Sequence, residues 1–120
     1  MPSLFNAYAT GRGMRKPLSL SVDLSKAENT FNAEVTGGSE PYHTRLEQTD
    51  GEWFYHCDCP DFQFTFWPKL KEDGVNIGEF PVVEGSGKGL PRHISEYGMC
   101  KHLLATVDKM IEQQEIPPFS

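Results

Sequence analysis

The chain has 120 residues, enough for one domain and too few for two domains of ordinary size. Aromatic residues make up 12% and charged residues 23%, a mixture too aromatic for a disordered chain and too polar for a membrane protein. The net charge is −6, and after the first 22 residues, which hold three basic side chains and no acid, 8 basic residues stand against 17 acidic ones. That balance disfavours broad nucleic-acid binding by the body of the chain, since such binding needs several Lys or Arg contacts to phosphate.

The chain starts with a short basic stretch. Residues 1–16 lack clear periodicity and include Gly11-Arg12-Gly13, so we expect a flexible basic arm. Two interpretations of this arm remain open. It contacts phosphate or an acidic partner through Arg12, Arg15 and Lys16, or it is a solvated tail.

Four strands are expected next. Residues 18–24, 31–35, 42–47 and 53–59 each alternate between apolar and polar positions, the pattern of a half-buried strand. Turn sequences separate them, and Asp50-Gly51 is a strong hairpin signal. Four short consecutive strands predict an antiparallel meander with one buried face.

Residues 60–99, called the spacer below, are the least regular stretch. Phe62, Phe64 and Phe66 fit a strand, whereas Phe62 and Phe66 also fit one helical turn, and Pro68 is expected to end the element. These aromatics form either a local core under a long loop or an exposed partner site. Since a disordered segment would be less aromatic, we expect the spacer to be ordered at least when bound. The main partner contact is then expected at residues 68–89, with candidate contacts Phe64, Trp67 and Phe80.

One C-terminal helix completes the expected fold. Residues 100–114 contain no Gly or Pro, and apolar side chains recur there at helical spacing until Pro117-Pro118 ends the pattern. The prediction is an α+β fold: a four-stranded antiparallel meander with one helix across it. It occupies residues 17–116 as a single domain, and residues 117–120 form a tail.

Three cysteines and a histidine carry the chemistry. In order they spell C-x-C, forty residues, then C-x-H: Cys57, Cys59, Cys100 and His102. Three cysteines do not make a disulfide framework and favour a reducing compartment. Cys₃His is a standard ligand set for structural zinc. Residues two apart on a strand point to the same side, and a helix start favours thiolate, so we expect one zinc ion to staple the last strand to the helix.

Two questions about this site stay open in the sequence. His56 or His93 could replace His102 as the fourth ligand. Asp58, Asp61 or His56 could act beside the metal, although hydrogen bonds that orient the ligands are the commoner role. Four protein ligands leave no position for an activated water, so we expect no catalytic residues, no enzyme activity and no small-molecule substrate.

The contexts of these ligands are Cys57-Asp58-Cys59-Pro60-Asp61-Phe62 and Gly98-Met99-Cys100-Lys101-His102-Leu103-Leu104-Ala105. They resemble the SWIM-type zinc finger, whose pattern is C-x-C, a variable spacer and C-x-H in a ββα arrangement. The resemblance covers residues 52–111 without the spacer, and it implies zinc on the four residues and a role in DNA or protein binding. The spacer is long for the family, and the finger lacks the larger domain it usually accompanies. Short stand-alone chains of this type resemble proteins of tailed bacteriophages.

Three functional hypotheses follow, in order of preference. The first is a non-enzymatic adaptor that binds a protein partner, in a phage virion or another large assembly. The second is an accessory protein that binds nucleic acid through the finger and the basic arm. The third, a metal hydrolase, is a distant last. No run of about 18 apolar residues exists and no secretion signal is present, so we expect no membrane contact and a reducing cytoplasmic location, or the virion or host cytoplasm for a phage protein.

Overall fold

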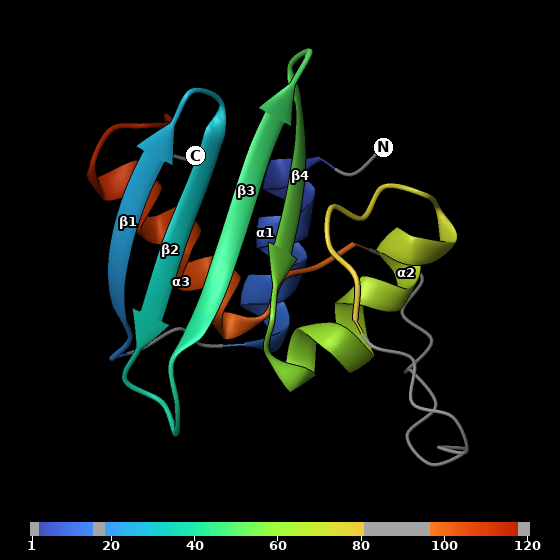
Figure 1. Ribbon diagram of the computed structural model, residues 1–120, viewed down its shortest axis with the longest axis horizontal. Helices are drawn as coiled ribbons and strands as arrows, with labels where there is room; N and C mark the ends of the chain where they lie inside the picture. The colour runs from blue at the N-terminus through green and yellow to red at the C-terminus, as the bar shows by residue number, and fades with distance from the viewer. Residues whose placement is uncertain (1–2, 16–18, 81–96, 118–120) are drawn as a thin grey trace.

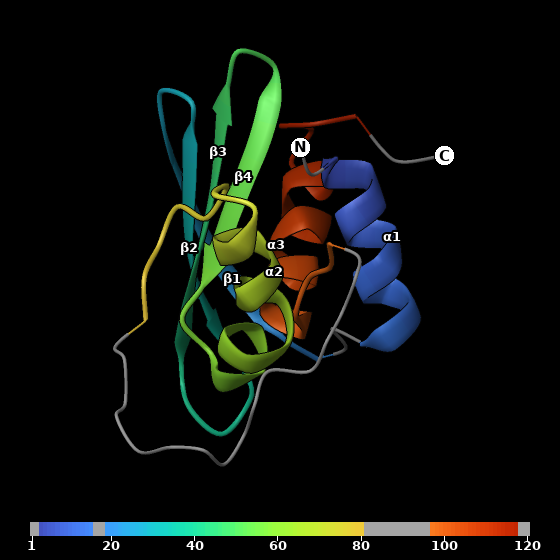
Figure 2. The same ribbon diagram turned by 90° about the vertical axis from the view of Figure 1, so that its right-hand side faces the viewer.

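A computed structural model describes residues 3–15, 19–80 and 97–117. Four antiparallel strands form one sheet in the order β1-β2-β3-β4, as the sequence predicts. The strands are β1 (Ser21–Ala27), β2 (Thr30–Thr36), β3 (Tyr42–Thr49) and β4 (Glu52–Cys57). Helix α3 (Lys101–Glu112) crosses one face of the sheet, and helix α1 (Leu4–Met14) packs against α3 on the side away from the sheet (Figures 1 and 2).

Two-residue turns set the register of the two outer hairpins. Thr49 pairs with Glu52 across Asp50-Gly51, and both turn residues have positive φ, at 52° and 80°. Asp-Gly is favoured there because its backbone twist matches that of the strands. Ala27 pairs with Thr30 in the same way across the β1–β2 turn.

The core lies between the sheet and α3. Alternating positions of the strands supply one side, including Phe31, Leu46 and Tyr55, each at most 4% exposed. The opposing side of α3 supplies Leu104, Val107 and Met110 at the expected helical spacing. The predicted α+β meander with one C-terminal helix across it is therefore confirmed.

The predicted flexible arm is wrong for residues 4–14, which form helix α1. Ser3 caps this helix by accepting a hydrogen bond from the backbone N–H of Asn6 at 3.4 Å. Its buried side is made of small and apolar residues, including Leu4, Ala7 and Gly11. A Cβ at Gly11 would lie 2.6 Å from the carbonyl oxygen of Met99, so glycine is what allows α1 to approach this backbone.

The first part of the spacer is helical. A π-helix, η1 (Phe62–Phe66), continues into α2 (Trp67–Glu72), and both lie beside the β4 edge (Figure 1). Pro68 was expected to end the aromatic stretch, but η1 leads directly into α2 and the helical backbone continues through Pro68 to Glu72. Phe62, Phe66 and Leu70 enter the main core. Residues 81–96 lie outside the part of the chain that the structure describes.

Candidate metal centre

Strand β4 and the turn that follows it position the first two cysteines. Cys57 is the last residue of β4 and pairs with Thr44 on β3. The backbone N–H of Asp58 donates to the carbonyl of His43 at 3.2 Å, so the ladder continues one residue past the strand. This extension keeps Cys57 and Cys59 on the same, buried side of the sheet, because side chains two apart share a face.

The start of helix α3 positions the other two ligands. Cys100 is the N-cap residue, with extended backbone at φ −72° and ψ 169°, and its carbonyl accepts the first helical hydrogen bond from Leu104 at 3.0 Å. His102 follows in the first turn. The free N–H groups and the positive end of the helix dipole favour negative charge at this point, and a thiolate supplies it.

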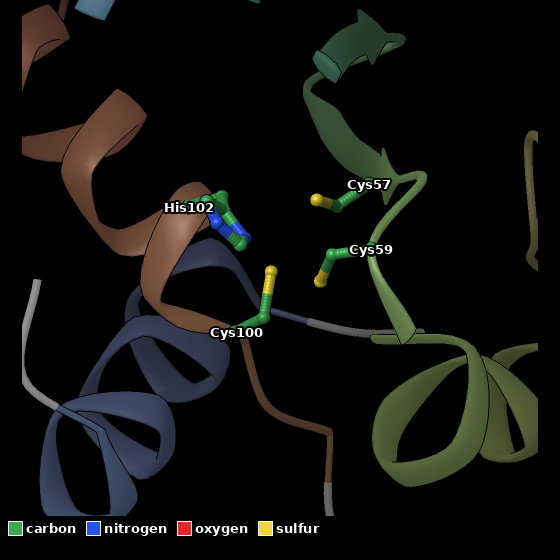
Figure 3. Close-up of side chains that lie close together, drawn as sticks. All are labelled: Cys57, Cys59, Cys100 and His102. Carbon is green, nitrogen blue, oxygen red and sulfur yellow. The ribbon is translucent and has the colours of Figure 1, made fainter. Parts of the chain in front are cut away.

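The four side chains converge on one point (Figure 3). Their ligand atoms all lie within 4.8 Å of one another, and all four residues are buried. A tetrahedral zinc with Zn–S bonds of about 2.3 Å needs ligands about 3.8 Å apart, so shifts of an ångström or less would complete the site. These residues could therefore hold one metal ion, and their donor set is one that suits zinc.

The local electrostatics also suit a cation. Hydrogen bonds from Cys100 and Cys57 lower the pKa of the Cys59 thiol, whose sulfur also accepts the backbone N–H of Phe62 at 3.3 Å. Burial raises the pKa of the Cys100 thiol well above its usual value. Three thiolates in this space would repel one another and lose their hydration, and a bound divalent cation would offset both costs.

The imidazole of His102 has a buried ring nitrogen that is available to bind a metal ion. Its Nδ1 is buried and has no hydrogen-bond partner among the residues described, a costly arrangement that coordination of the ring by a cation would relieve. The Tyr42 ring packs beside the imidazole with centroids 4.9 Å apart and restricts its orientation. His102 is thus the histidine brought to the three cysteines.

The alternative fourth ligands are not part of the cluster. His56 lies on the opposite face of β4, between the rings of Phe62 and Phe80 at 5.3 and 5.0 Å. Burial lowers the pKa of His56, and a Cβ at Gly78 would lie within 2.7 Å of its ring, so the segment around Gly78 covers it closely. His93 lies outside the described ranges.

The two aspartates beside the ligands hold the chain around the centre. Asp58 accepts the backbone N–H of His43 at 2.8 Å and contacts its ring Nδ1 at 3.3 Å. Asp61 accepts two hydrogen bonds of 2.7 Å from Arg15 and one of 3.1 Å from Thr65. The two carboxylates therefore hold the backbone on either side of Cys59: Asp58 ties it to strand β3, and Asp61 ties it to Arg15 and to η1.

The residues predicted to contact a partner are dispersed. Phe64 is 47% exposed on η1, whereas Trp67 and Phe80 pack edge to face at 5.2 Å beside His56. Arg15 pairs with Asp61, and Arg12 pairs with Asp108 of α3 at 3.3 Å. Lys16 lies outside the described residues. The pairing of Arg15 with Asp61 was missed, because nothing local connects residues 46 positions apart.

No protein-family model matches the chain, and comparisons with curated proteins and with solved structures also find no match. Within the described ranges, none of the helices combines the length and the apolar character that crossing a membrane requires. The function must therefore be argued from the site itself.

Proposed function

We propose that this chain is a non-enzymatic protein-binding module held together by one structural zinc ion. The observation that carries this proposal is the buried set of three cysteines and one histidine, joined from the end of β4 and the start of α3. Four protein ligands fill a tetrahedron, so no coordination position is left for an activated water or a substrate. The metal then stabilises the fold, and the function is binding.

The resemblance to the SWIM-type finger supports the same role. The C-x-C and C-x-H pairs occur in a strand-then-helix arrangement, and the resemblance implies binding to protein or DNA. We propose an adaptor in a phage virion or another large assembly. A protein partner is favoured over DNA, because Arg12 and Arg15 of the N-terminal stretch are already paired with carboxylates of this chain and are less available to contact phosphate.

Metal analysis tests the structural part of the proposal. The purified chain should contain one zinc per molecule, and Cys57→Ser, Cys100→Ser and His102→Ala should each lose it. Structural zinc contributes about 10–16 kcal/mol to folding in small fingers, so these variants should also unfold at much lower denaturant concentration.

His56→Ala is the matched control for the histidine ligand. It removes an imidazole one residue from Cys57 but on the opposite face of β4, so the zinc content should stay at one. Full zinc content in His102→Ala would contradict the ligand assignment and point to His56 or His93 as the fourth ligand.

A titration with labelled duplex DNA at two salt concentrations separates the adaptor from the nucleic-acid hypothesis. Binding at physiological salt should be weak, and Arg12→Gln with Lys16→Gln should remove what remains. Removing residues 1–16 is a poorer variant, since Leu4 and Ala7 belong to the core. Tight, salt-sensitive binding that survives both substitutions would favour the nucleic-acid hypothesis.

A further inference from the structure

A groove lies between the two outer hairpin turns, the start of α1 and the residues after α3. Figure 1 shows the two hairpin turns and the start of α1 at the same end of the molecule. The volume of the groove is about 790 Å³, within the range of sites that hold a few side chains of a ligand. We call it the hairpin-end groove. Its lining comes from the β1–β2 turn, the β3–β4 turn, the first turn of α1 and residues 115–117.

The floor of this groove is apolar and aromatic. Phe31 of β2 and Trp53 of β4 approach each other across β3, with ring centroids 6.0 Å apart, and Leu4 and Ile116 also line the groove. Phe5, which is 48% exposed, stands at the rim on α1. Phe31 is buried beneath this floor, whereas Trp53 is only partly buried and Phe5 is exposed. Aromatic side chains with part of their surface open to solvent are typical of the centres of protein interfaces.

The rim carries a surplus of negative charge. Four ionisable side chains line the groove, and Lys26 is paired with Glu115 at 3.1 Å. Glu28, in the β1–β2 turn, and Glu52, the first residue of β4, are exposed and form no ion pair with any described residue. The Lys26 ammonium also lies 5.3 Å from the centroid of the Phe31 ring, so a cation already sits favourably against this floor.

The groove is separate from the metal centre. Strand β4 begins at Glu52, on the rim, and ends at Cys57, the first metal ligand, so the length of the strand separates the two sites. Substitutions in exposed rim residues should therefore leave the zinc content unchanged. This separation lets the two properties be tested independently.

We infer that the hairpin-end groove binds a peptide segment of a partner protein in which an aromatic or large aliphatic side chain is flanked by lysine or arginine. The apolar anchor packs against Trp53 and Phe5, the groove aromatics with surface open to solvent, and the basic side chains pair with Glu28 and Glu52. This inference rests on the proposed role as a protein-binding module and adds the chemistry of the partner. The acidic rim disfavours an acidic peptide, because like charges at the interface oppose binding.

Selection from a random peptide library displayed on phage, with the zinc-loaded chain as target, tests this inference. The selected peptides should share an apolar anchor flanked by basic residues. A synthetic peptide of the selected sequence should shift the NMR signals of the Trp53 indole and of Gln48, which line the groove. Signals of Lys101 and His102, which lie at the metal centre and not in the groove, should not move.

Matched variants locate the site. Glu28→Gln with Glu52→Gln should weaken the synthetic peptide about tenfold, the effect of losing two rim charges, and Phe5→Ala should weaken it further. Asp23→Asn with Glu72→Gln changes the charge equally at exposed positions outside the groove and should leave the affinity unchanged. Zinc content is measured for every variant.

The outcomes are distinct for the two proposals. Acidic peptides, no selected peptide, or peptides that bind the rim variants with unchanged affinity would overturn the groove inference. Binding by a chain that ends at Pro117, with none by the full chain, would mean that residues 118–120 are the occupant, and would overturn it as well. A chain that purifies without zinc would refute the structural-zinc proposal alone.

Discussion

A pair of buried hydroxyl groups joins the sheet to helix α3, and its removal should show a strong asymmetry. The hydroxyl of Thr106 donates to the carbonyl of His102 at 2.8 Å, so it must accept at its 2.7 Å contact with Thr44. Thr44→Val should therefore cost only the net value of one hydrogen bond, about 0.5–1.5 kcal/mol. Thr106→Val leaves the Thr44 hydroxyl buried with no acceptor and should cost about 1–3 kcal/mol.

The double variant decides whether this reasoning holds. With both hydroxyls replaced by methyl groups of similar shape, no buried donor is unsatisfied, and the double variant should be more stable than Thr106→Val alone. Urea unfolding at one fixed concentration of free zinc measures the three free energies of unfolding, because the metal itself shifts the equilibrium. Strictly additive losses would refute the interaction of the two hydroxyls, and a larger loss in Thr44→Val than in Thr106→Val would refute the assignment of donor and acceptor.

Three further predictions concern the helix α1 and the metal. Gly11→Ala should destabilise the fold by about 1–3 kcal/mol despite the better helix propensity of alanine, because the new Cβ would lie 2.6 Å from the Met99 backbone. A Cβ at Gly13 would have no neighbouring atom within 4 Å, so Gly13→Ala should stabilise the fold by up to about 1 kcal/mol. Equal effects of the two substitutions in thermal unfolding would contradict the close contact at Gly11. Arg15→Met should cost about 1–2 kcal/mol, since the pair with Asp61 is bidentate but its side chains are 25% and 33% exposed, and chemical denaturation of Asp61→Asn should give a similar loss. Excess EDTA should unfold the chain by removing the metal. At a fixed EDTA concentration the metal should leave faster as the pH falls, because protons compete with it for the thiolates and the imidazole. Zinc retention measured against pH tests this, and slower loss at lower pH would contradict it.

The sequence predicted the sheet, helix α3 and the grouping of three cysteines with His102, because local patterns and residue chemistry encode them. Asp50-Gly51 specifies its turn through backbone conformation, and the spacing of Leu104, Val107 and Ile111 needs only a 3.6-residue period. The ligands could be grouped because metal chemistry limits the choice of partners for three cysteines. The turn and the helix are predicted from a few neighbouring residues, and the Cys/His cluster is predicted from the chemistry of its residue types.

The structure of residues 4–14 and 62–72 could not be predicted in this way. Helix α1 contains Gly11 and Gly13, which disfavour a helix locally, and Gly11 is explained only by the Met99 backbone that it meets. In η1, the spacing of the aromatics fits two kinds of element, and burial against the rest of the core selects between them. The hairpin-end groove was also missed, since it is assembled from four separate segments.

The long-range contacts of α1 have a consequence for how the protein folds during synthesis. Tyr8 and Arg12 both bind Asp108, at sequence separations of 100 and 96 residues. Helix α1 is synthesised before α3 and therefore cannot reach its packing surface until α3 has also emerged from the ribosome, roughly 5–20 s later at ordinary rates of translation. Until then its apolar side is open to chaperones and to other nascent chains, and the sheet also lacks the helix that covers its buried face.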